Sequence, residues 1–84
     1  METKNVIKAF INNHFLKGDK SIALHDDTLF IDAGIIDSVG VLELVAFVEE
    51  TFGFRVEDEE LIPENLDSIN RLVTYVKLKT AVAS

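Results

Sequence analysis

A serine hydroxyl stands beside a carboxylate at the predicted start of a helix. The two residues are Asp37 and Ser38, and the apolar, helix-forming run 39–54 follows them without a break. Asp37 can accept a backbone N–H of the first turn and so cap the helix, which makes Ser38 its first residue. A hydroxyl placed there is open to other molecules, and the partial positive charge of a helix N-terminus suits a phosphate. The pattern therefore predicts an exposed hydroxyl beside a carboxylate at the start of a helix.

Other reactive constellations are weaker. Ser38, His25 and an aspartate could form a triad, but no Gly-x-Ser-x-Gly turn or oxyanion loop accompanies them. His14 and His25 are more simply read as partly buried or surface histidines. A solvated loop explains a further set of acids better than a calcium site does, because they lack its spacing and central glycine: Asp26, Asp27 and Asp32. We therefore expect no metal site and no enzymatic activity of the chain itself.

The length and composition limit the possible classes. With 84 residues, the chain is expected to form one domain, residues 1–84, with little room for a buried catalytic cleft. It contains no cysteine, which excludes disulfides and thiolate chemistry. The N-terminus has no continuous apolar segment, and the longest apolar run, 44–48, is far shorter than the ~20 residues that span a bilayer. We expect a cytoplasmic protein that does not insert into membranes.

The negative charge is concentrated around Ser38. The net charge is −7, and residues 37–67 hold ten acids against one base, whereas the rest of the chain holds five acids and seven bases. Such a field repels nucleic acids and favours encounters with basic protein surfaces. The pattern predicts protein partners and no nucleic acid.

The hydrophobic spacing predicts a first helix over about residues 4–17. Thr3 is a possible N-cap, Gly18 a possible stop, and the apolar residues recur at helical spacing. From residue 19 to 36 the periodicity is lost. The pattern there is typical of a long loop anchored by apolar side chains, namely Leu24, Leu29, Phe30, Ile35 and Ile36.

The second helix is predicted to run from Ser38 to Gly53. A 100° step per residue places one set of side chains on a core face: Val41, Leu44, Val45, Val48 and Phe52. Glu43 and Glu50 lie nearly opposite, with Phe47 beside them as either a partner contact or a packing residue. The remaining phenylalanines of the two helices and of the following turn are assigned to the core: Phe10, Phe15, Phe52 and Phe54.

Two shorter segments complete the expected fold. The acids 57–60 are predicted to begin a short helix that Pro63 stops, and Asp67 is predicted to cap a last helix that begins at about Ser68. Residues 80–84 are expected to form a flexible tail. The predicted fold class is all-α, a small four-helix bundle with a long loop between helices one and two and a short third helix.

This order of parts resembles the acyl, peptidyl and D-alanyl carrier protein family over roughly residues 4–79. The resemblance depends on the phrase 34–39 (Gly-Ile-Ile-Asp-Ser-Val), on the Glu-Glu-x-Phe-Gly ending at 49–53, and on the acidic segment and closing helix that follow. A second Asp-Ser-aliphatic sequence at 67–69 lies too near the C-terminus to have two further helices after it, and it is read as a helix cap.

The resemblance implies that Ser38 carries 4′-phosphopantetheine derived from coenzyme A, with Asp37 as cap and charged contact. The chain would then be a monomer that carries acyl or aminoacyl thioesters. Its partners would be a phosphopantetheinyl transferase, an acyl- or aminoacyl-loading ligase or synthase, and a downstream acyltransferase. The implied partner-binding residues are Val39, Glu43, Phe47, Glu49, Glu50, Val56 and Asp58.

The cargo is less defined. Val39 and Gly40 stand where carriers of fatty acid synthesis usually have leucine and an acid. The sequences of residues 29–38 and 64–69 resemble those of D-alanyl or aminoacyl carriers more closely. Gly40 indicates either close approach by a partner or the arm, or a small residue that is simply tolerated. The β-branched core face of the second helix favours a short cargo. A different class stays open, an acidic helical interaction module without a prosthetic group.

Overall fold

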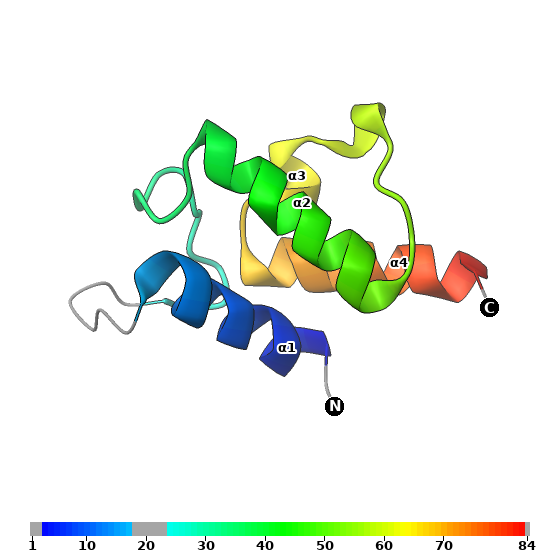
Figure 1. The fold of residues 1–84 in the computed structure, drawn as a ribbon, viewed down its shortest axis with the longest axis horizontal. Helices are drawn as coiled ribbons and strands as arrows, with labels where there is room; N and C mark the ends of the chain where they lie inside the picture. The colour runs from blue at the N-terminus through cyan, green and yellow to red at the C-terminus, as the bar shows by residue number, and fades with distance from the viewer. Residues whose placement is uncertain (1–2, 18–23, 84) are drawn as a thin grey trace.

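The structure, a computed structural model, describes residues 3–17 and 24–83. Within these residues it contains helices and turns and no strand (Figure 1). The α-helices are α1 (Thr3–Phe10), α2 (Ser38–Phe52), α3 (Pro63–Leu66) and α4 (Ile69–Ala83), with a π-helix η1 (Ile11–Leu16) and a 3₁₀-helix η2 (Asp58–Glu60). The predicted all-α class is confirmed.

The first helical segment changes type along its length. α1 passes directly into η1, so helical residues extend to Leu16, close to the predicted end. Thr3 is already inside the helix and is not its cap. Lys17 ends the segment with a left-handed backbone, φ 50° and ψ 37°, a role that glycine fills more often. The stop predicted at Gly18 lies outside the described residues.

Helix α2 begins and ends as predicted. Asp37 is its N-cap, with φ −103° and ψ −174°, and its carboxylate accepts the N–H of Gly40. Gly53 closes the helix in the left-handed region, φ 74°, and donates its N–H to the Glu49 carbonyl at 3.0 Å. Glycine suits this position because it has no Cβ to oppose a positive φ.

The described part of the long loop, residues 24–37, is held by backbone bonds and buried side chains. Phe30, Ile35 and Ile36 are each less than 10% exposed. The N–H groups of Ile35 and Ile36 both donate to the Phe30 carbonyl, at 2.9 and 3.3 Å. Their burial confirms the predicted apolar anchors at these three positions.

One acid of the loop joins it to the helices around it. Asp26 forms ion pairs with Lys4 and Lys8 of α1, and its carbonyl accepts the N–H of Asn70 in α4. The hydrogen bond and charge of Lys4, with a smaller contribution from Lys8, lower the pKa of the Asp26 carboxyl below its ordinary value. Asp26 is therefore a structural contact between the loop and the two helices.

The segment after α2 differs from its predicted form. Pro63 begins α3 and does not stop a helix, because proline lacks only an N–H that the first turn leaves unbonded and its φ is already helical. Ser68, and not Asp67, provides the cap of α4, since its Oγ accepts the N–H of Arg71 at 3.1 Å. α4 continues to Ala83, so the tail expected at 80–84 is helical as far as the structure describes it.

Glu60 ties this segment to α4. Its carboxylate accepts the Tyr75 hydroxyl at 3.0 Å and the Lys79 ammonium at 2.9 Å, and it also accepts the N–H of Glu57. The Glu57 N–H and the Lys79 ammonium lower the pKa of the Glu60 carboxyl. Burial and the nearby Glu60 carboxylate raise the pKa of Tyr75. These bonds hold residues 57–62 against α4.

The core lies where α4 meets the other helices. α4 contacts α1, α2 and α3, and Figure 1 shows a short connection that leads from α3 to the start of α4. Its largest fully buried side chains come from α1, η1, α2, α4 and the loop: Phe30, Ile7, Ile11, Leu44, Ile69, Leu72, Val48 and Val76. The loop thus contributes the largest of these side chains.

Candidate functional site

Ser38 is the first residue of α2, and it is exposed. The cap that precedes it is formed by the Asp37 Oδ1, which accepts the Gly40 N–H at 2.7 Å. The Asp37 carbonyl accepts the N–H of Val41 at 3.0 Å and closes the first turn. The hydroxyl therefore stands on a rigid turn, at the end of the helix where the dipole favours negative charge.

Gly40 is explained by packing within the chain. A Cβ built on Gly40 would lie 2.9 Å from Cγ2 of Ile36 and 3.0 Å from Cε1 of Phe15, closer than real Cβ contacts allow. The first helical segment and the loop therefore approach Gly40 closely enough to account for the glycine. Because Gly40 has no side chain, the loop and η1 can pack closely against the first turn of α2.

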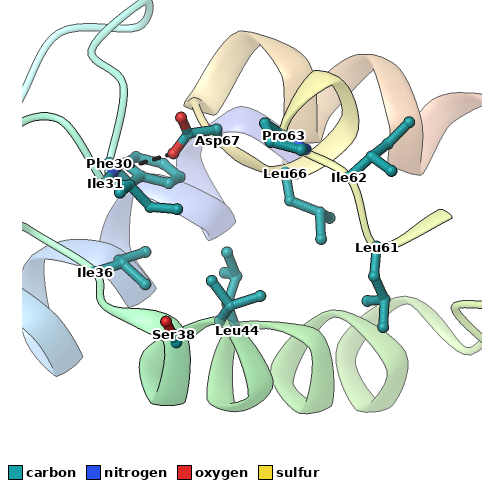
Figure 2. Close-up of a pocket in the computed structure, with 11 residues that line it drawn as sticks. Phe30, Ile31, Ile36, Ser38, Leu44, Leu61, Ile62, Pro63, Leu66 and Asp67 are labelled. Atoms are coloured by element: carbon teal, nitrogen blue, oxygen red, sulfur yellow. Dashed lines mark hydrogen bonds between the residues drawn. The ribbon is translucent and has the colours of Figure 1, made fainter. Parts of the chain in front are cut away.

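An apolar pocket of about 280 Å³ opens beside Ser38 (Figure 2). α2 supplies Val41 and Leu44, and the other walls come from the loop and from residues 61–67. In Figure 2 the side chains of Ile36, Leu44 and Leu66 point into this space. Val45 and Val48 are not among the lining residues, so the β-branched face that favoured a short cargo borders the pocket only at Val41.

A second, more open groove is also lined by Ser38. It has a volume of about 900 Å³ and runs between the end of the first helical segment and the start of α2. Its polar lining includes Asn13, His14, Lys17, Asp37 and Glu43. Ser38, Ile31 and Ile36 line both cavities, so Ser38 borders an apolar pocket and an open groove of mixed polar and apolar lining.

The predicted partner surface of α2 is partly engaged with the first helical segment. Glu43 is exposed, and its Oε2 is hydrogen bonded to Nε2 of His14. Phe47 is half-buried and stacks on Phe10 with ring centroids 3.8 Å apart, while Phe10 also stacks on His14. Phe47 is therefore a packing residue between α1 and α2.

Two of the proposed partner residues have structural roles instead. Val56 is only 9% exposed and belongs to the core, so the structure contradicts its assignment to a contact surface. Its N–H donates at 2.9 Å to the carboxylate of Glu49, which is half-buried and fixes the turn after α2. Glu50 and Asp58 are exposed, as a surface role requires.

Three apolar residues near Ser38 are exposed, and of these the sequence indicated only Val39 as a partner-binding residue, whereas Leu42 and Ile31 were missed. Val39 is 66% exposed and Leu42 is 63% exposed, and their i, i+3 spacing places them on the same side of α2. Ile31, at 51% exposure, lies at the pocket. The spacing of Leu42 from Val39 was a usable signal, whereas the exposure of Ile31 depends on the path of the loop.

The described residues offer no other obvious type of site. Among residues 3–17 and 24–83, no group of three or more histidine, aspartate or glutamate side chains is placed to hold a metal ion. None of the helices in this part of the chain is both long and apolar enough to cross a membrane.

Comparison with known proteins places the chain in a family. The family description "Phosphopantetheine attachment site" matches residues 16–76. The D-alanyl carrier protein of Abiotrophia defectiva is 29% identical over 77 residues, which cover 92% of this chain and 90% of that protein. The D-alanyl carrier protein of Streptococcus uberis is 37% identical over 54 residues, covering 64% of this chain and 67% of that protein.

One solved structure is similar in fold to this chain. Its title is "Crystal structure of FAD-dependent dehydrogenase", and one of its chains aligns with a TM-score of 0.73 and 27% identity. The alignment covers 83% of this chain and 97% of that chain. Because the family match spans well over half of the residues and includes the α2 start, this chain belongs to the family with a phosphopantetheine attachment site, whose prosthetic group is 4′-phosphopantetheine.

Proposed function

We propose that this chain is a carrier protein in which Ser38 receives 4′-phosphopantetheine and holds an acyl or aminoacyl cargo for partner enzymes. The observation that carries the proposal is the exposed Ser38 hydroxyl at the capped start of α2, inside the region that matches the family. Carrier proteins of this kind are generally not catalysts, and they work with ligases and transferases. We also infer that the four α-helices form the bundle typical of such carriers.

The residues around Ser38 fit the prosthetic group. The helix N-terminus suits the phosphate that would be joined to Ser38, and the exposed hydroxyl leaves room for the transferase. Ser38 lines two cavities, which offer the arm one apolar surface and one of mixed polarity. When bound, the group supplies a terminal thiol that carries the cargo as a thioester, a nucleophile that this cysteine-free chain lacks.

Treatment with a phosphopantetheinyl transferase and coenzyme A tests the proposal directly. The intact mass of the protein is expected to rise by one phosphopantetheine group. If the mass does not change with a transferase that modifies a known carrier in the same tube, the chain is an acidic helical interaction module instead.

The cargo we favour is D-alanyl or another aminoacyl group. The two relatives described above are D-alanyl carrier proteins. The apolar pocket beside Ser38, at about 280 Å³, falls just below the ~300–1,000 Å³ of typical small-molecule sites. A pocket of this size gives little shelter to a long chain, whereas a small polar group can stay on the arm in water.

Thermal melts of loaded protein test this cargo. We expect D-alanyl and octanoyl loads on the arm to give melting temperatures within about 2 °C of each other, because neither cargo is bound by the folded chain. The measurement is circular dichroism of each loaded form against the unloaded holo form. A large stabilisation by the octanoyl load alone would show that the pocket takes up an acyl chain, and it would overturn the aminoacyl assignment.

We further propose that partner enzymes contact the exposed side of α2. This surface combines apolar Val39 and Leu42 with the acids Asp37, Glu43 and Glu50, all of them exposed. An apolar centre with an acidic rim suits a partner that carries a basic rim around an apolar patch.

Glu43→Lys is expected to slow modification by the transferase on the order of fivefold at low ionic strength. The effect should shrink towards wild type in 1 M salt, where the Debye length falls to about 3 Å. Initial rates at both salt concentrations measure it. Asp27→Lys, the same charge change at an exposed loop position, is the matched control and should have little effect.

Glu43→Lys also removes the contact between Glu43 and His14. The variant His14→Ala separates the loss of this contact from the change of charge. We expect His14→Ala to keep a nearly normal rate, because it leaves the acidic charge in place. A fivefold loss with Glu43→Lys that persists in 1 M salt would indicate a folding defect and contradict steering by charge.

A further inference from the structure

Asp67 binds two successive residues of the loop. Its backbone carbonyl accepts the N–H of Phe30 at 3.0 Å, and its Oδ1 accepts the N–H of Ile31 at 3.1 Å. The second bond is drawn in Figure 2. The two partners are 36 residues apart in the chain, so this is a long-range contact. It joins the end of α3 to the loop that precedes Ser38.

The contact is continued towards Ser38 by the loop itself. Phe30 is 1% exposed, and its carbonyl accepts the N–H groups of Ile35 and Ile36, the two residues before the Asp37 cap. Ile31 is half-exposed and lines both cavities beside Ser38. Figure 2 shows Ile31 and Ile36 on the same side of the pocket as Ser38. The Asp67 carboxylate therefore fixes the backbone of a residue at the pocket mouth.

We infer that Asp67 is a specificity-determining residue, which acts through Ile31 to keep the apolar pocket beside Ser38 narrow. The inference deepens the proposed function. It depends on that function in one respect, namely that the pocket is the space next to the cargo. With the Ile31 N–H bound, the Ile31 side chain stays at the mouth. Without that bond, residues 31–34, all of which are exposed, can move away and admit a longer apolar group.

The two hydrogen bonds allow a test with an internal control. In Asp67→Ser the side chain is one bond shorter, so its oxygen does not reach the position of Oδ1. The substitution therefore removes the acceptor of the Ile31 N–H but keeps the backbone carbonyl that binds Phe30. In unmodified protein, amide exchange followed by NMR should speed up about tenfold or more at Ile31 and change little at Phe30. Asp67→Asn keeps an Oδ1 acceptor and should restore slow exchange at Ile31.

The pocket itself is probed with 1-octanol, a neutral molecule that the acidic surface does not repel. Chemical shifts of the Leu44 and Leu66 methyl groups, which line the pocket, report binding. The apparent Kd should fall about threefold or more in Asp67→Ser and stay near wild type in Asp67→Asn, because a larger fraction of the Ser variant is open. Neither the exchange measurement nor the octanol titration needs the prosthetic group. Both results can therefore be interpreted even if Ser38 is not modified.

A second variant covers the case in which Asp67→Ser does not fold. Ile31→Ala shortens the side chain at the mouth without touching Asp67, and it should also tighten octanol binding. Unchanged exchange at Ile31 in Asp67→Ser, or unchanged octanol affinity in both variants, would overturn the inference. A faster exchange spread evenly over α4 would mean that Asp67 only stabilises the fold, and would overturn it as well.

Discussion

Ser38→Ala is expected to abolish the uptake of phosphopantetheine completely. The transfer joins the phosphate to a side-chain oxygen, and alanine has none at the position that the α2 N-terminus presents. The variant should remain folded, because Ser38 is exposed and the cap is formed by Asp37. Intact mass spectrometry after treatment with transferase and coenzyme A measures the result, with circular dichroism as the check on folding.

Ser68→Ala is the matched control, since Ser68 also follows an aspartate and precedes an aliphatic residue. Ser68 is only 3% exposed, and its Oγ is occupied as acceptor for the Arg71 N–H. This variant should lose about 0.5–2 kcal/mol of stability with its cap and still gain the full mass increment at low temperature. Modification that survives in Ser38→Ala would show that another residue is the attachment site.

Phe30→Ala is expected to lower the free energy of unfolding by about 3–5 kcal/mol. Phe30 is 1% exposed and is one of the largest fully buried side chains, although it lies in a loop. Its removal leaves a cavity in the core and enlarges the pocket that it lines. Because a small domain is stable by only ~5–15 kcal/mol, the melting temperature should fall by more than about 10 °C. Denaturant unfolding at equilibrium gives the free energy.

The neighbouring Ile31→Ala provides the comparison. Ile31 is 51% exposed, so its truncation should cost about 1 kcal/mol or less. Equal losses in the two variants would mean that the loop does not take part in the core.

The start of α2 was predictable because its signals are local. The Asp37 cap accepts an N–H only three residues away, and Gly53 closes the helix through its own positive φ. The predicted exposure of Glu43 and Glu50 also holds, since it follows from the 100° step of a single helix. Features that depend on neighbours within a few residues can be read from the order of residues.

Several of the errors concern residues whose partners are distant in the chain. Asp67 looked like a helix cap, but its carboxylate binds the loop at Ile31. Val56 looked like a surface contact and is in the core. For Gly40 the sequence left two explanations open, and neither included the contact with Ile36 and Phe15 that a side chain there would make. In each case the partner is determined by packing between segments, which hydrophobic spacing does not encode.

By itself, the sequence determined the helical class, the capped serine at the start of the second helix and the acidic region around it, because propensity, capping and charge act within a few residues. The tertiary structure alone decided what surrounds that serine. Ile31 and Ile36 of the loop, and Leu61 and Leu66 of the segment beyond α2, line the pocket that Ser38 also lines. These residues come together because α4 packs against the other helices. A pocket is formed by the space between elements and not by any one of them.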